Sequence, residues 1–192
     1  LKGNPGDFDF STLSGRNLES VYLPPCTTAQ IAVLRGQNIR DITFSLRRTE
    51  DTKPIAELLA TFPLEKLQFA GELKDYSFLK DKKLRELFLR PMGKEVSFNP
   101  EWLRGQPLEK LTVFGTFGDK ATDWTVLKNM SHLKEIVFIC AAISDPSAFA
   151  GLPVEKLALQ QCCFEQPEVL EAIARMPKLQ MLHIGRLNYA SP

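Results

Sequence analysis

The chain has 192 residues, which is enough for one ordinary domain or for a modest array of repeats. Apolar residues make up 44% of the chain and charged residues 24%, which are average globular values and exclude the disordered and collagen-like classes. The net charge of +1 gives no electrostatic reason to expect a nucleic acid or an anionic membrane surface as partner, and no apolar run approaches the roughly 18 residues needed to span a bilayer.

A phrase of the form apolar-x-x-apolar-x-apolar recurs eight times along the chain, at intervals of 20 to 25 residues. In a strand, alternate side chains point to opposite faces, so the fourth and sixth positions of each phrase point together into a core and the fifth points away from it. One copy cannot bury this stripe alone, so neighbouring copies must stack. The phrases therefore predict eight strands, whose phrases begin at Leu18, Ile39, Leu64, Leu84, Leu108, Leu133, Val154 and Leu179.

Short helices are predicted on the return from one strand to the next. Apolar residues recur at helical spacing over residues 55–62 and again over residues 169–176. Asn99 and Asp145 are each followed by a proline, which the first turn of a helix tolerates, and their side chains can cap the free amides of that turn. Asp123 precedes a similar apolar run. We therefore expect strands on one face of the array and short helices or single turns on the other.

The phrase and its period resemble the leucine-rich-repeat family over about residues 13–187. The resemblance implies an α/β fold: a right-handed, curved leucine-rich-repeat solenoid with a parallel sheet on its concave face and short helices or turns on its convex face. It divides the chain into an N-terminal segment or partial cap (residues 1–12) and a leucine-rich-repeat domain of about eight repeats of 20–25 residues (residues 13–192). Cys26 and Cys162 fall at position nine, where the family usually has asparagine or cysteine. The other repeats depart from this, so we expect an irregular array.

Charges alternate in sign from one repeat to the next at positions two and three of the phrase. Parallel strands in register lie about 4.8 Å apart, so each of these side chains is expected to meet an opposite charge on either side. We interpret them as a structural charge ladder that fixes the register, rather than as a surface for a charged ligand; duplication of a two-repeat unit is a compatible origin. The ladder comprises Glu65, Arg85, Glu109, Lys134 and Glu155 at position two, and Lys66, Glu86, Lys110, Glu135 and Lys156 at position three.

Positions five and seven of the repeats are not committed to the core and should face solvent on the concave side. In repeats four to six they carry Phe88, Arg90, Phe114, Val137 and Ile139. Aromatic and aliphatic side chains beside an arginine are typical of a protein-binding hot spot. We therefore predict a partner-binding site there. Cover by the chain's own loops or by a flanking domain is one alternative, and the absence of any role is the other.

No catalytic residue, metal site or cofactor is predicted. His132 falls in a turn and His183 on the last strand, and the sequence has neither a nucleophile elbow nor cysteines and histidines at the spacing of metal ligands. The four cysteines do not determine the redox compartment, and no targeting segment indicates a localisation.

These features favour a non-catalytic protein–protein interaction module that binds a protein partner on its concave face. The first alternative is a targeting or substrate-recognition domain of a larger enzyme, such as a kinase- or ligase-associated repeat domain. The second is self-association into a homo-oligomer through the C-terminal repeat, which has no clear polar capping repeat after it.

Overall fold

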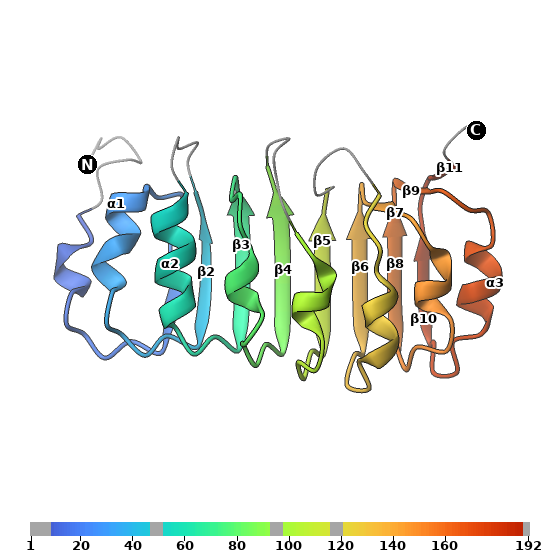
Figure 1. Ribbon diagram of the computed structural model, residues 1–192, viewed down its shortest axis with the longest axis horizontal. Helices are drawn as coiled ribbons and strands as arrows, with labels where there is room; N and C mark the ends of the chain where they lie inside the picture. The colour runs from blue at the N-terminus through green and yellow to red at the C-terminus, as the bar shows by residue number, and fades with distance from the viewer. Residues whose placement is uncertain (1–8, 47–51, 93–97, 116–120, 190–192) are drawn as a thin grey trace.

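An eight-stranded parallel sheet runs through the whole computed structural model, which describes residues 9–46, 52–92, 98–115 and 121–189 (Figure 1). The order along the sheet is the order along the chain, β1-β2-β3-β4-β5-β6-β8-β10. All eight strands lie on the eight recurring phrases, so the predicted strands and the parallel sheet are confirmed. Their bounds are β1 Ser20–Tyr22, β2 Asp41–Ser45, β3 Lys66–Gly71, β4 Glu86–Pro91, β5 Lys110–Phe114, β6 Glu135–Ile139, β8 Lys156–Gln160 and β10 Met181–Ile184.

Short helices connect the strands and lie along one side of the sheet (Figure 1). Three are α-helices: α1 (Thr28–Ile31), α2 (Lys53–Thr61) and α3 (Val169–Ala174). The others are single turns of 3-10 helix: η1 (Ser11–Leu13), η2 (Ala32–Leu34), η3 (Ser77–Leu79), η4 (Pro100–Leu103), η5 (Thr125–Asn129) and η6 (Pro146–Phe149).

The predicted caps of these helices are formed. The side chain of Asn99 accepts a hydrogen bond from the amide of Glu101 at 3.0 Å, and that of Asp145 accepts one from the amide of Ser147 at 2.8 Å. Of the N-terminal segment predicted over residues 1–12, residues 1–8 lie outside the described part of the chain.

The core lies between the sheet and its helices. The fourth and sixth positions of the phrase supply its sheet side, as in β3, where Leu67 and Phe69 are buried and Gln68 between them is half-exposed. A continuous row of aromatic rings supplies the centre, with consecutive ring centroids 4.9–6.4 Å apart. This row, which the phrases did not predict, is formed by Phe69, Tyr76, Phe98, Trp124, Phe138, Phe149 and Phe164.

A second, three-stranded parallel sheet follows the main sheet in the C-terminal repeats, with the order β11-β9-β7. Its strands are β7 (Ala142–Ile143), β9 (Cys162–Phe164) and β11 (Leu187–Tyr189). The chain turns into it at Cys140 and Gln161, which have the left-handed φ values of 54° and 53° that side chains other than glycine rarely adopt. The recurring phrases did not predict this second sheet, so it is an addition to the expected architecture.

Two buried glutamines join consecutive repeats through backbone groups. The side chain of Gln106 accepts a hydrogen bond from the amide of Leu84 at 3.2 Å and donates one to the carbonyl of Leu79 at 2.9 Å, both in the preceding repeat. Gln37 makes the equivalent two bonds to the first repeat. Each glutamine therefore supplies a partner to an amide that the turn before the strand leaves unpaired, and it gives a second donor to a carbonyl that already accepts a bond within that turn. We refer to Gln37 and Gln106 as the inter-repeat glutamines.

One repeat has a leucine at the position of the inter-repeat glutamine, and there the preceding turn pairs its own backbone amide. The amide of Leu133 bonds to the carbonyl of Met130 at 3.2 Å, within its own turn. The following repeat carries Leu152, which is buried, at the position that Gln106 occupies in its own repeat. The polar side chain is thus present at the repeats where the backbone needs a partner and absent at this one.

Candidate functional site

The candidate site is the face of the sheet opposite the helices, which we call the open face (Figure 1). Side chains at positions three, five and seven of the phrase form it, because alternate residues of a strand point to the same side. Most of these side chains are half-buried by their neighbours on adjacent strands, as Thr43, Gln68 and Val137 are. The open face is therefore a surface of closely packed side chains with their ends in solvent.

The five residues predicted to bind a partner lie together on β4, β5 and β6. The register places Phe88 of β4 and Val137 of β6 on either side of Thr112 of β5, and it places Phe114 beside Ile139. Arg90 is exposed, and the other four predicted residues are half-buried. We call the set of Phe88, Arg90, Phe114, Val137 and Ile139 the apolar patch.

Arg90 lies over the ring of Phe114, with its guanidinium carbon 4.6 Å from the ring centroid. A cation at this distance is attracted by the negative face of the ring. The contact holds the arginine against the apolar patch and partly covers the ring. Both residues occupy position seven of consecutive repeats, so the sequence indicated that they are neighbours but not that they stack.

A hollow of about 320 Å³ opens in the apolar patch above Thr112. Thr112 is buried at its floor, and the larger side chains of Phe88 and Val137 stand on either side. Glu86, Lys110 and Glu135 line one end of the hollow. The hollow thus lies where a small side chain stands between two large ones.

Position three of the phrase forms one continuous column of alternating charge across the sheet. The register aligns Asp41, Lys66, Glu86, Lys110, Glu135 and Lys156 on successive strands. Within the described residues the column pairs in twos: Lys66 bonds to Glu86 at 3.1 Å and Lys110 to Glu135 at 2.8 Å. Among the described residues, Asp41 at one end of the column and Lys156 at the other form no ion pair.

Position two forms a second column beside the first. Arg40 pairs with Glu65, and Glu109 accepts hydrogen bonds from both Arg85 and Lys134. These two cationic donors lower the pKa of Glu109 from its ordinary value of 4.5 to about 2. Within the ranges that the structure describes, Glu155 forms no ion pair.

The expectation that every charge meets an opposite charge on both sides is therefore too strong. In each column a paired side chain forms its ion pair with one neighbouring strand only. Glu109 is the exception among the described ladder residues, with ion pairs on both sides. The two columns line a groove of about 460 Å³ with five basic and five acidic side chains, so the groove has no net charge. That the columns fix the register stays a prediction.

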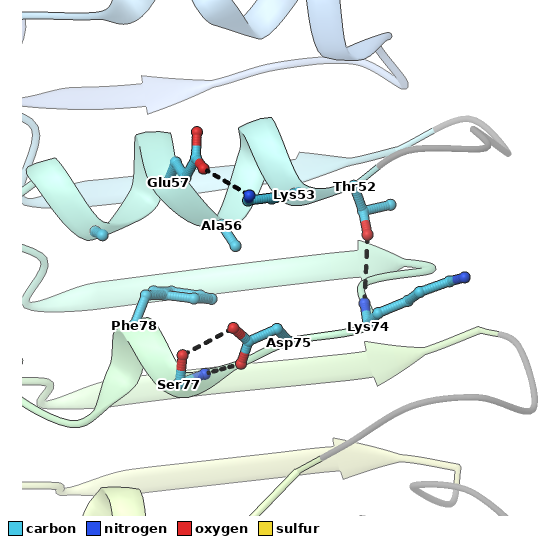
Figure 2. A pocket seen from close by; sticks show the side chains of 9 residues that line it. Thr52, Lys53, Ala56, Glu57, Lys74, Asp75, Ser77 and Phe78 are labelled. Atoms are coloured by element: carbon cyan, nitrogen blue, oxygen red, sulfur yellow. Dashed lines mark hydrogen bonds and ion pairs between the residues drawn. The ribbon is translucent and has the colours of Figure 1, made fainter.

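A groove of about 400 Å³ lies on the opposite, helical side, between α2 and η3 (Figure 2). Its polar side chains bond to one another. Lys53 lies 3.8 Å from Glu57, and Asp75 accepts hydrogen bonds from the amide and the hydroxyl of Ser77. In Figure 2 these pairs lie along the walls, and no group of polar side chains converges on the centre. This groove is the weaker candidate for a binding site.

Among the described residues, no group of three or more histidine, cysteine, aspartate or glutamate side chains is arranged to hold a metal ion. Both histidines are exposed, His132 in a turn and His183 on β10. No helix in the described ranges is long and apolar enough to cross a membrane.

Comparisons of the chain with models of protein families, with curated proteins and with solved structures give no match.

Proposed function

We propose that the chain is a leucine-rich-repeat solenoid that acts as a non-catalytic protein–protein interaction module and binds a protein partner on its open face. In this proposal the open face is the concave face of the solenoid. The observation that carries it is the gathering of Phe88, Phe114, Val137 and Ile139, from three strands, into one patch beside an exposed arginine. Central aromatic and arginine side chains surrounded by polar ones are typical of binding hot spots.

The packing of the patch supports this role further. Half-buried side chains have already lost part of their conformational freedom, and the stacking on Phe114 restrains Arg90 as well. These side chains therefore lose little further conformational entropy when a partner binds. The neutral groove beside the patch offers no excess of positive charge to phosphates, which favours a protein over a nucleic acid as partner.

Quantitative affinity capture tests the proposal. The bait is the immobilised chain, and proteins that bind it from a lysate are measured by mass spectrometry against the Phe88→Ala/Ile139→Ala variant. The matched control is Leu170→Ala on α3, which removes a side chain 55% exposed on the helical side. We expect specific partners to be lost with the open-face variant and kept with the control. Equal capture by all three folded proteins, with folding checked by circular dichroism, would contradict the proposal.

Self-association through the C-terminal repeat is a second candidate function with an observation of its own. In β10, Leu182 is 46% exposed and Met181 58% exposed, whereas the residues equivalent to Leu182 in the seven other strands of the main sheet are buried. Burial of Leu182 against a second copy would remove this apolar surface from water. Sedimentation equilibrium of the wild type and of Leu182→Glu separates the two functions, since a wild type that stays monomeric excludes self-association.

A further inference from the structure

A second recess lies on the open face between β1 and β4, next to the apolar patch. Its floor consists of the small side chains Thr43, Ser45 and Ala70 together with Gln68. Tyr22, which is 82% exposed, stands at one side and Phe88 at the other. We call this recess the trough. Its volume of about 210 Å³ is below the range of roughly 300–1,000 Å³ of pockets that enclose a small molecule, so it favours a macromolecular ligand.

The strand spacing across the trough is comparable with the width of an α-helix, so one side of a helix can rest on it. Three strand spacings separate β1 from β4, which gives a width of about 14 Å, and the trough together with the position-three residues that precede it spans about 13 Å along a strand. An α-helix with its side chains is about 10–12 Å across, and two turns of it are about 11 Å long. The small residues of the floor let such a helix approach the sheet between the two aromatic side chains.

The backbone of the sheet also favours a helix over an extended peptide. On the open face the amide and carbonyl groups of the interior strands bond to neighbouring strands, as the parallel register from β1 to β4 requires. They therefore cannot pair with the backbone of a peptide laid across the face. A helix satisfies its own backbone groups, so it can contact the trough through side chains alone.

Two carboxylates lie beyond the trough, toward the beginning of the strands. Asp41 of β2 and Glu19, which precedes β1, form no ion pair among the described residues. The cations closest to them in the two columns are already engaged: Lys66 bonds to Glu86 at 3.1 Å, and Arg40 bonds to Glu65. Lys66 attracts Asp41 without forming an ion pair with it, so both carboxylates can still accept an ion pair from a cation of a partner.

We infer that the trough binds an amphipathic α-helix of the partner protein, with an apolar stripe between Tyr22 and Phe88 and a lysine or arginine against Glu19 and Asp41. This inference rests on the proposed function, because it names the chemistry of a partner that binds the open face.

Selection from a displayed library of helix-forming peptides of about 18 residues tests the inference. We expect peptides selected by the wild-type chain to carry apolar residues at i, i+3 or i+4, and i+7, with a lysine or arginine near one end of this stripe. For the strongest peptide, fluorescence polarisation should show a roughly tenfold loss of affinity with Tyr22→Ala. Asp41→Lys should cost roughly two- to fivefold, and a lysine-to-glutamate change in the peptide should restore that loss.

Leu170→Ala is the control and should leave the affinity of the peptide unchanged. Failure to select any peptide overturns the inference, and so does selection of peptides without basic residues or of peptides that bind Tyr22→Ala as well as the wild type. A peptide that loses affinity with Ile139→Ala but not with Tyr22→Ala overturns the trough as its site and leaves the apolar patch standing. Partners captured from a lysate independently of Phe88 and Ile139 overturn the proposed function of the patch instead.

Discussion

Replacement of Gln106 by methionine tests whether the inter-repeat glutamines hold the array together. Methionine has nearly the same length and shape, so the change removes hydrogen bonds with little change in packing. Gln106 is 6% exposed, and its amide group bonds to three backbone groups: the N–H of Leu84 and the carbonyls of Leu79 and Trp102.

The magnitude follows from these three bonds. A buried amide left without a partner at Leu84 costs about 1–3 kcal/mol, and each of the two lost carbonyl bonds contributes about 0.5–1.5 kcal/mol. The methionine offsets roughly 1 kcal/mol of this through additional apolar burial. We therefore expect Gln106→Met to lower the free energy of unfolding by about 3 kcal/mol.

Urea unfolding followed by circular dichroism measures this loss, with the m-values compared to check that the unfolded states are alike. The matched control is Gln68→Met on the open face of β3. Gln68 is half-exposed and forms no side-chain hydrogen bond within the described residues, so we expect a change within about 0.5 kcal/mol. If Gln106→Met changes the free energy no more than Gln68→Met does, the glutamine contributes nothing to the joining of the repeats, and the reasoning is refuted.

Three further predictions concern the charge columns and the thiols. Lys110→Glu should lower the free energy of unfolding, and adding Glu135→Lys should restore about 0.2–1 kcal/mol of it in a double-mutant cycle; strictly additive effects would show that the pair is not coupled. Because the pKa of Glu109 falls from 4.5 to about 2 on folding, its contribution to stability is complete above pH 4.5 and is lost as the pH falls toward 2. Thermal unfolding of Glu109→Gln should therefore depend less on pH in this window than that of the wild type, and equal slopes would contradict this. Burial raises the pKa of Cys162 to about 11, so iodoacetamide should modify the half-buried Cys163 in the folded chain and reach Cys162 only after unfolding, as peptide mass spectrometry would show.

The positions of the eight strands followed from the sequence because every repeat contributes one strand at the same phase. Leu67 and Phe69 face the core because they occupy the fourth and sixth positions of the phrase, as their counterparts do in the other repeats. A shift of one residue in the register would move all of these side chains to the solvent face. The adjacency of Phe88, Thr112 and Val137 on the open face followed from this phase as well.

Features that depend on differences between repeats did not follow from the shared phrase. The stacking of Arg90 on Phe114 depends on one arginine rotamer, and the exposure of Leu182 depends on its place in the last strand of the main sheet. Gln37 and Gln106 did leave a signal, since both follow the letters L-R-G in the turn before a strand. That signal lies outside the strand phrase. The role of the glutamine follows from it only once the structure shows the unpaired amide of the preceding repeat.

The strands of the main sheet lie side by side in the order in which the ribosome makes them. Each new strand after the first can dock on a finished neighbour made just before it, and no strand of this sheet has to wait for a distant part of the chain. Assembly during synthesis can therefore advance one repeat at a time, with a single growing edge exposed at each moment. A chain built in this way presents little unpaired backbone to its neighbours in a crowded cell while it is being made.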